Sequence, residues 1–311
     1  MAVFTPLTES DIQTHLKNYD LGELHAWHGI AEGVENSNFY LETTTGRYIL
    51  TLFEKRTSEA DLPYFIGLME HLATHGIYCP KPLPSRQDQL TSRLKDRPAV
   101  IVTFINGQGV RAIETHHLVS LGMLAAQMHM AGKDFTPTRA NTLSLAGWQA
   151  LAEKMGTRAD EIAPGLARLI ADEIDYLNAH WPRHLPNGPV HADLFPDNVF
   201  FDGAELSGVI DFYFACNEVF AYDLAICAAA WCFDTQHQFI PERLYALLRG
   251  YESVCPLIED ERSAFPILLR GAALRFLLTR AHDQLFHPAG AQVTQKDPLE
   301  YLAKLRYFQD A

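Results

Sequence analysis

The stretch that decides the fold is GPVHADLFPDNVFFDGAELSGVIDF, which runs from residue 188 to residue 212. It places four side chains capable of chemistry among residues that favour burial: His191, Asp193, Asn198 and Asp211. The segments NVFF and GVIDF have the composition of strands, and the Asp-Gly pair between them is a strong signal for a hairpin turn. The stretch therefore predicts a loop followed by a β-hairpin, with Asp211 at the end of its second strand.

The polar residues of this stretch have the spacing H-x-D-x-x-x-x-N, followed by a second acid. This spacing suits phosphoryl transfer, in which a protein must hold metal ions on the phosphates and orient the attacking hydroxyl. We expect Asp193 to accept the hydroxyl proton and His191 to brace the loop. Asn198 and Asp211 offer hard oxygen ligands of the kind that Mg²⁺ prefers. The stretch is therefore the candidate catalytic centre.

Hydrophobic patterning changes near residue 107. Before it, the sequence predicts a helix after Thr8, the strands SNFYLET and RYILTLF, a helix over 59–75 and a buried strand over 97–107. After it, helical spacing dominates, over 116–132, 166–180, 219–233, 241–252, 260–282 and 297–307. We therefore predict a nucleotide-binding N-terminal half, residues 1–106, and a catalytic and substrate-binding C-terminal half, residues 107–311.

The composition limits the class of protein. The 311 residues are 48% hydrophobic and 20% charged, which is enough to fill a core, and the net charge is −13. A charge of that sign argues against nucleic acid or an anionic membrane as partner. No apolar run approaches the roughly 18 residues of a membrane span, and the N-terminus lacks signal-peptide features. The five cysteines, an odd number in apolar surroundings, indicate thiols in a reducing compartment. We expect a cytoplasmic protein, and the sequence leaves its oligomeric state open.

The opening stretch resembles the catalytic loop and metal-binding Asp of the protein-kinase-like superfamily, in particular its branch of aminoglycoside phosphotransferases and choline kinases. The later string FAYDLA, with Asp223, resembles the helix acid that ties down the catalytic loop in that branch. The likeness extends from residue 20 to residue 305. It implies an α+β, two-lobed protein-kinase-like fold with an antiparallel sheet in the small lobe and a mainly helical large lobe. It also implies ATP and Mg²⁺ as cofactors.

Within that branch, five strings are similar to bacterial homoserine kinases of the phosphotransferase type: GIAEGVENSNF (29–39), LTLFEKR (50–56), HADLFPDNVFF (191–201), IDFYFACN (210–217) and KDPLEYLAKLR (296–306). This resemblance implies phosphorylation of the L-homoserine hydroxyl in threonine biosynthesis. Two alternatives stay open. One is a kinase for another small alcohol, such as an amino alcohol, a sugar or an aminoglycoside. The other is a nucleotide-binding regulatory protein without turnover.

Nucleotide contacts are expected in two places of the N-terminal half. A turn within 29–38 would present main-chain N–H groups to phosphates, and the glycine there would allow a close approach. The string FING, 104–107, would be the hinge between the lobes, where main-chain groups read adenine. The candidate nucleotide-binding residues are Gly33, Asn36, Ser37, Asn38, Phe104 and Asn106.

One feature of the kinase pattern is missing. The position expected for the phosphate-binding strand lysine falls on Thr51, and the helix that follows has no glutamate at the usual place. Lys55 and Arg56 lie just beyond, and either could reach a phosphate or simply be a solvent-exposed charge at the end of the strand. What replaces the usual lysine and glutamate stays open.

The segment after Asp211 limits the acceptor. Only the 11 residues FYFACNEVFAY separate Asp211 from Asp223, which is too short for a peptide platform, and Glu218 is their single acid. A compact acceptor fits better than a protein or a polycation. A carboxylate on it would call for arginine. Arg275, inside the apolar string AALRFLL, and Arg280 are the candidates, and each is also open to plain structural pairing.

Overall fold

The computed structural model describes residues 5–30, 36–54, 58–286 and 296–311, and its contacts divide the chain into two compact units. Unit 1 comprises Met1–Gly107 with Ser207–Tyr213, and unit 2 comprises Gln108–Leu206 with Phe214–Ala311. The chain thus crosses from unit 1 to unit 2 at Gly107, returns for one short segment and crosses back. The predicted roles of residues 1–106 and 107–311 remain a prediction.

Unit 1 is built on a five-stranded antiparallel sheet in the order β1-β2-β3-β5-β4. Its strands are β1 (Leu24–Gly29), β2 (Ser37–Thr43), β3 (Gly46–Leu52), β4 (Ser92–Leu94) and β5 (Arg97–Thr103). The β2–β3 hairpin runs from the Ser37–Leu52 pair to the Thr43–Gly46 pair, as the alternating pattern predicted. The edge strand β1 was not predicted, because its string LHAWHG does not alternate between buried and exposed residues.

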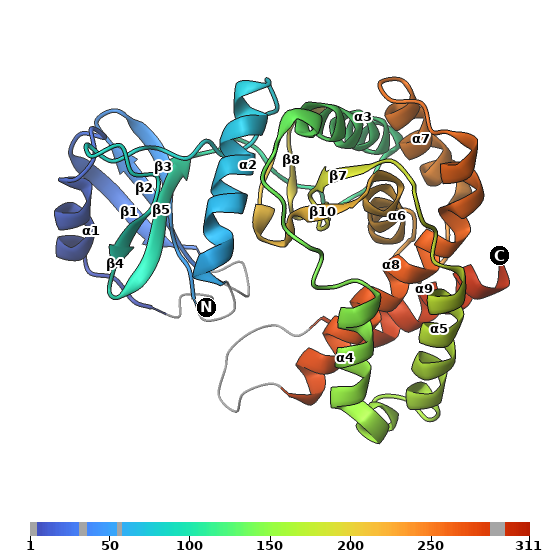
Figure 1. Cartoon of the computed structure of the whole chain (residues 1–311). Helices are drawn as coiled ribbons and strands as arrows, with labels where there is room; N and C mark the ends of the chain where they lie inside the picture. Colours follow the sequence, from blue (N-terminus) through green and yellow to red (C-terminus); the bar gives the residue numbers. More distant parts are fainter. Residues whose placement is uncertain (1–4, 31–35, 55–57, 287–295) are drawn as a thin grey trace. The chain divides into compact units, whose positions relative to one another are not determined.

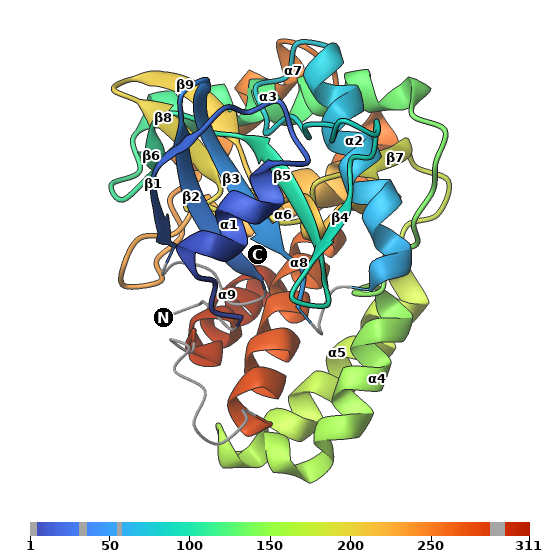
Figure 2. The same cartoon turned by 90° about the vertical axis from the view of Figure 1, so that its left-hand side faces the viewer.

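Helix α1 (Glu9–Leu16) covers one face of this sheet (Figure 2). It begins with a capping box, in which the Thr8 side chain accepts from the Asp11 N–H and the Asp11 carboxylate accepts from the Thr8 N–H. Its apolar face packs on Phe39, Leu41 and Leu50, which are almost completely buried. A short 3₁₀ helix, η1 (Glu59–Asp61), leads into α2 (Leu62–Thr74), close to the predicted bounds of 59–75.

Unit 2 is mainly helical (Figure 1). Its long elements are α3 (Thr115–Ala131), α4 (Leu145–Met155), α5 (Leu166–His180), α6 (Phe220–Trp231), α7 (Pro241–Glu252), α8 (Glu259–Leu285) and α9 (Pro298–Asp310), with 3₁₀ turns η2 (Gly132–Asp134) and η3 (Gly156–Glu161). Six of the seven long helices match segments predicted from the 3.6 spacing, and α4 does not. Nearly every residue of α6 is buried, so this helix forms the centre of the unit.

Short strands of unit 2 hold the opening stretch. Strand β7 (Asn187–Val190) pairs antiparallel with β10 (Cys216–Val219), and neither was predicted. A second small sheet has the order β6-β8-β9, from β6 (Gln108–Gly109), β8 (Val199–Asp202) and β9 (Glu205–Val209). The predicted hairpin is present, and Gly203 in its turn has a φ of 61°, which glycine adopts without strain. Strand β9 and the 3₁₀ turn η4 (Phe212–Phe214) carry the chain through unit 1 and back.

None of the helices in the described part of the chain is long and apolar enough to span a bilayer. All five cysteines are free thiols, and four of them are buried.

Candidate active site

The catalytic loop, which we define as residues 191–198, joins β7 to β8, and its main chain is hydrogen-bonded to side chains of α6. The carboxylate of Asp223, in the first turn of α6, is 1% exposed. It accepts hydrogen bonds from the main-chain N–H groups of Ala192, at 2.8 Å, and His191, at 3.3 Å. The indole Nε1 of Trp231 donates to the carbonyl oxygen of Leu194 at 2.7 Å. These bonds hold the loop backbone on α6, and the supporting role of Asp223 in catalysis stays a prediction.

A buried histidine completes this support. His129 Nε2 lies 3.0 Å from the Asp223 carboxylate, and its Nδ1 lies 3.0 Å from the hydroxyl of Tyr251. Burial alone would raise the pKa of Asp223, but the hydrogen bond and charge of His129, together with the charge of His191 and the hydrogen bond from the Ala192 N–H, outweigh burial and hold that pKa below its ordinary value. The sequence reading missed His129, because a single histidine on a helix with no motif around it carries no local signal.

Asp193 and Asn198 lie at the two ends of the loop turn and are directly bonded. Asn198 Nδ2 donates to the carbonyl oxygen of Asp193 at 2.8 Å and to its carboxylate at 3.0 Å. This use of the amide nitrogen leaves the amide oxygen of Asn198 for another partner. The main-chain N–H of Asp193 donates to His191 Nδ1 at 3.2 Å, which is the contact expected of a brace.

The Asp193 carboxyl has the electrostatics of a general base. Burial raises its pKa to about 6, although the charges of Arg275 and Lys296 oppose this rise. A carboxylate whose pKa is raised toward neutrality is a stronger base than an exposed one, while it stays ionised above that pH. The arrangement therefore suits removal of a proton from a hydroxyl.

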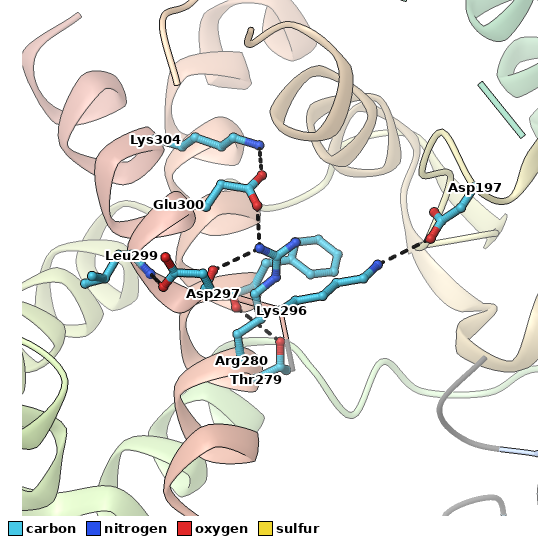
Figure 3. Close-up of polar contacts among 9 residues, drawn as sticks. Asp197, Thr279, Arg280, Lys296, Asp297, Leu299, Glu300 and Lys304 are labelled. Carbon is cyan, nitrogen blue, oxygen red and sulfur yellow. Dashed lines mark hydrogen bonds and ion pairs between the residues drawn. The ribbon is translucent and has the colours of Figure 1, made fainter. Parts of the chain in front are cut away.

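Lys296 was not singled out from the sequence, although it begins the string KDPLEYLAKLR. Its Nζ lies 3.4 Å from the carboxylate of Asp197, a residue of the catalytic loop (Figure 3). The same Nζ lies 5.2 Å from the ring centroid of Phe195, another residue of that loop. The side chains of Lys296 and Asp197 are 55% and 65% exposed. An ion pair so exposed adds little stability, and its main effect is to place a positive charge beside the loop.

Arg275, on α8, is buried without a full set of hydrogen-bond partners. It is 1% exposed, and its guanidinium carbon lies 4.8 Å from the ring centroid of Phe276 and 5.7 Å from that of Phe214. Within the described residues its Nε and Nη1 have no hydrogen-bond acceptor. Leaving charged donors unsatisfied in a protein interior is costly. Such donors are therefore suited to a ligand that brings oxygen atoms.

Other buried polar atoms of the same unit also have no hydrogen-bond partner among the described residues, and they include the hydroxyls of Tyr222 and Tyr301 and the indole N–H of Trp148. The Tyr222 hydroxyl is near the Arg275 guanidinium but forms no well-aligned hydrogen bond with it. The Tyr301 ring packs on Phe276, beside Arg275, at 5.2 Å between centroids. The sequence reading missed these groups, since an isolated Tyr or Trp in an apolar helix is usually core.

Arg280, the second candidate for a carboxylate, is already paired. Its Nη1 donates to the Glu300 carboxylate at 2.6 Å and to the carbonyl oxygen of Asp297 at 3.0 Å, and Lys304 donates to the same Glu300 at 2.6 Å (Figure 3). These bonds connect the C-terminal part of α8 to the first turns of α9. The assignment of Arg280 to the substrate stays a prediction, and its contacts favour the structural alternative.

The second predicted metal ligand, Asp211, follows β9 in the segment that belongs to unit 1, whereas Asn198 belongs to unit 2. Asp211 is exposed and has a φ of 69°, a conformation that non-glycine residues rarely adopt outside special sites. The described residues contain no group of three or more His, Cys, Asp or Glu side chains that could hold a metal ion. The assignment of Asn198 and Asp211 to metal binding stays a prediction.

The candidate phosphate-binding residues that the structure describes bond within unit 1. Asn36 accepts from the Glu54 N–H, Ser37 donates to the Glu54 carboxylate at 2.8 Å, and Asn38 accepts from the Thr51 hydroxyl at 2.8 Å. Gly33, Lys55 and Arg56 lie outside the described residues. These bonds tie the start of β2 to the end of β3.

Thr51 occupies the expected lysine position and is 2% exposed. Its hydroxyl donates to Asn38 and also contacts the hydroxyl of Tyr213, so this part of β3 holds a buried hydrogen-bond pair in place of a cation.

The predicted hinge residues are also engaged. The main-chain N–H of Phe104 donates to the carbonyl oxygen of Arg47 at 3.3 Å, and the carbonyl oxygen of Asn106 accepts from the Ser207 hydroxyl at 2.6 Å. The side chain of Arg47 donates to Asn106 Oδ1 and covers the ring of Phe104. The role of these two residues in binding adenine stays a prediction.

Residues 26–257 match the family model of the phosphotransferase enzyme family, described by the term APH. A relative from Rhizobium rhizogenes, named homoserine kinase, is 55% identical over 307 residues, which cover 99% of this chain and 96% of the relative. A relative of the same name from Xanthobacter autotrophicus is 53% identical over 309 residues, which cover 99% of this chain and 96% of the relative.

Solved structures share the fold at low identity. Spectinomycin phosphotransferase, in complex with ADP and spectinomycin, superposes with a TM-score of 0.73 at 14% identity, over 98% of this chain and 95% of that chain. Amicoumacin kinase, in complex with AMP-PNP, Ca²⁺ and Ami, gives a TM-score of 0.71 at 17% identity, over 98% of this chain and 92% of that chain.

Proposed function

The chain belongs to the phosphotransferase enzyme family, and from that premise we propose that it is an ATP-dependent homoserine kinase. It transfers the γ-phosphoryl group of ATP to the side-chain hydroxyl of L-homoserine and forms O-phospho-L-homoserine and ADP. Relatives above 50% identity over almost the full chain support this acceptor. The reaction places the protein in threonine biosynthesis, and its free cysteines are in keeping with a cytoplasmic location.

The observation that carries the proposal is the buried Arg275 beside the catalytic loop. Its charge lowers the pKa of Asp193, and two of its donor atoms, Nε and Nη1, have no acceptor among the described residues. A carboxylate accepts from a guanidinium through two parallel hydrogen bonds. An acceptor with a carboxylate at one end and a hydroxyl at the other can therefore satisfy Arg275 and reach Asp193.

In this mechanism the residues of the catalytic loop prepare the hydroxyl. The oxygen of the hydroxyl forms a bond to the γ-phosphorus of ATP, the bond from that phosphorus to the bridging oxygen breaks, and the hydroxyl proton passes to Asp193. Asn198 holds the Asp193 carboxylate through its Nδ2, and Asp223 holds the loop backbone. The proton-accepting oxygen is thus fixed before the acceptor arrives, which lowers the cost of orientation.

The donor set suits magnesium. The amide oxygen of Asn198 and the carboxylate of Asp211 are hard oxygen ligands, and Mg²⁺ usually takes one or two such groups together with phosphate oxygens and water. When bound, the ion would neutralise charge on the phosphates during transfer. We therefore assign Asn198 and Asp211 to metal binding within the same proposal.

A panel of acceptors tests this proposal. ADP release is followed with L-homoserine, choline, 3-amino-1-propanol, a sugar and an aminoglycoside, each with and without Mg²⁺. We expect turnover that depends on Mg²⁺ and is highest with L-homoserine. Higher kcat/KM for another alcohol would assign the chain to that acceptor. ATP binding by calorimetry without ADP release on any alcohol would identify the non-catalytic nucleotide binder, an alternative motivated by Thr51 at the lysine position.

A further inference from the structure

We propose that the carboxylate of Glu218 binds the α-ammonium group of the amino acid acceptor. The acceptor is then recognised at three points: the hydroxyl by Asp193, the carboxylate by Arg275 and the ammonium by Glu218. This inference rests on the proposed function and adds to it a residue that determines specificity. The argument uses only residues of unit 2.

The sheet pairing places Glu218 on the strand next to the one that leads into the catalytic loop. On β10, Glu218 is opposite Gly188 of β7, and Cys216 is opposite Val190, which immediately precedes the loop. Because side chains alternate along a strand, Cys216 and Glu218 share one face of β10. The residue between them, Asn217, turns the other way and bonds to the main chain of Arg139. Glu218 and Cys216 therefore belong to the same side of the strand.

The carboxylate of Glu218 is half-buried and positioned by neutral donors. Its Oε2 accepts from Asn141 Nδ2 at 2.9 Å, and its Oε1 accepts from the Val219 N–H at 2.9 Å. Among the described residues, no Lys, Arg or His nitrogen lies within ion-pair distance of it. A partly desolvated carboxylate that lacks a cation is suited to bind one. The two neutral donors fix its direction and leave further lone pairs for an ammonium group.

Glu218 and Arg275 act on the same buried groups with opposite signs. Burial raises the pKa of the Cys216 thiol to about 12; the charges of Arg275 and Arg139 lower that pKa, and the charges of Glu218 and Asp223 raise it. The Tyr222 hydroxyl responds to the charges of Arg275 and Glu218 in the same way. The guanidinium and the carboxylate therefore act on the same two buried groups, and electrostatic effects of this kind decline with distance. A positive charge on Arg275 and a negative charge on Glu218 complement the carboxylate and the ammonium group of a zwitterionic amino acid.

Three-point recognition has consequences that plain carboxylate binding lacks. An analogue without the ammonium group, 4-hydroxybutyrate, would leave Glu218 unpaired in the complex. In D-homoserine the ammonium group and a hydrogen atom exchange positions, so the ammonium group would be poorly placed to bind Glu218. The protein therefore should discriminate against both analogues, and this discrimination should depend on the charge at position 218.

The experiment measures kcat and KM of wild type, Glu218→Gln and Glu218→Asp with L-homoserine, D-homoserine and 4-hydroxybutyrate. In Glu218→Gln, the KM for L-homoserine should rise at least roughly tenfold, the usual scale for losing one partner of a charged pair. Its kcat/KM for 4-hydroxybutyrate and its KM for ATP should change little. Glu218→Asp keeps the charge and should recover part of the preference for L-homoserine.

Glu153→Gln is the matched control, because it makes the same change at an exposed glutamate on α4 of the same unit. We expect it to leave the KM for L-homoserine and the preference for L-homoserine over 4-hydroxybutyrate unchanged. If Glu218→Gln retains the wild-type preference, or if Glu153→Gln loses the preference equally, the carboxylate of Glu218 does not bind the ammonium group. If wild type itself does not phosphorylate L-homoserine, the proposed function fails, and that result is distinguishable from a failure of Glu218 alone.

Discussion

The carboxylate of Asp223 accepts a hydrogen bond from the main-chain N–H of Ala192 at 2.8 Å, and Ala192 has a φ of 63°. A non-glycine residue in this left-handed region is strained, and such strain persists only where neighbouring groups fix it. The same carboxylate is bonded to His129. One buried acid on α6 therefore fixes the backbone next to Asp193, the proposed base.

The first prediction concerns this support. Asp223→Ala leaves His129 and the loop N–H groups without an acceptor, so it should lower the free energy of unfolding by about 3–5 kcal/mol. Asp223→Asn keeps one acceptor oxygen and should cost less, while its kcat falls because the loop is less well fixed. Urea denaturation and steady-state kinetics measure the two effects. Wild-type stability in Asp223→Ala would show that the loop is held by other contacts.

The second prediction concerns the base. Asp193→Asn should fold, bind ATP and lose kcat by about 10²-fold or more, the usual scale of general-base catalysis. Asp197→Asn is the matched control, because Asp197 lies in the same loop but is exposed and paired only with Lys296 among the described residues. Its kcat should change by less than about threefold, since exposed ion pairs contribute little. Near-normal turnover of Asp193→Asn would mean that another group accepts the proton.

The third prediction concerns the acceptor carboxylate. Arg275→Lys keeps the charge but loses the planar pair of donors, so the KM for L-homoserine should rise while the KM for ATP changes little. Arg275→Ala should weaken the use of L-homoserine by at least about tenfold. Wild type and both variants should use the carboxyl-free analogue 3-amino-1-propanol about equally well, because it has no carboxylate for Arg275 to bind.

Arg280→Lys is the control for Arg275. Arg280 is bonded to Glu300, so its variant should lower the Tm and leave the KM for L-homoserine unchanged. The opposite pattern would assign recognition of the acceptor carboxylate to Arg280. In that pattern, Arg275→Ala has a lower Tm with an unchanged KM for L-homoserine, and Arg280→Lys has a raised KM.

The fourth prediction concerns the metal. Asp211→Ala should nearly abolish turnover at any Mg²⁺ concentration, because it removes the charged ligand. Asn198→Ala should be rescued in part at high Mg²⁺, since water can replace one neutral ligand. The affinity for Mn²⁺ in the presence of ADP, measured by electron paramagnetic resonance, gives a readout apart from turnover. Equal and mild effects of both changes on this affinity would place the metal elsewhere.

The fifth prediction concerns stability at low pH. Burial alone would raise the pKa of Glu300, but Lys304 and Arg280 outweigh burial and hold that pKa at about 2. A pKa that is depressed in the folded state stabilises the protein above the ordinary value of 4.5, and this contribution is lost as the pH falls from there toward 2. The loss for this one group should be at most about 3 kcal/mol.

Glu300→Gln isolates this contribution. The variant should be less stable than wild type at pH 7, because Lys304 and Arg280 lose their shared counter-charge. The difference between the two proteins in urea denaturation should shrink between pH 5 and pH 3, an interval chosen to bracket the ordinary carboxyl pKa. A constant difference over that interval would show that the ionised Glu300 does not carry the effect.

Much of the fold could be predicted from sequence, because long amphipathic helices and the β2–β3 hairpin carry strong periodic signals. The expected α+β kinase-like fold and the phosphotransferase family are confirmed by the family match and by the superposed structures. Strands β7 and β10, with four residues each, are too short to show a period, and tertiary pairing defines them.

The candidate site divides in the same way. The sequence alone indicates His191, Asp193 and Asn198, because their spacing within one loop suits phosphoryl transfer. The partners on other elements, His129, Tyr251 and Lys296, are separated from the loop by many residues, so no local pattern marks them. Assignment of the individual site residues remains a prediction until the variants are measured.

The central claim, that the chain transfers a phosphoryl group from ATP to L-homoserine, is tested most directly by identifying the product. Purified protein is incubated with ATP, Mg²⁺ and L-homoserine, and the mixture is followed by phosphorus NMR and mass spectrometry, with Asp193→Asn as the control. The account predicts O-phospho-L-homoserine and ADP in equal amounts, with almost none from Asp193→Asn. Release of inorganic phosphate in place of the phosphoester, or ADP formation that is independent of L-homoserine, would contradict it.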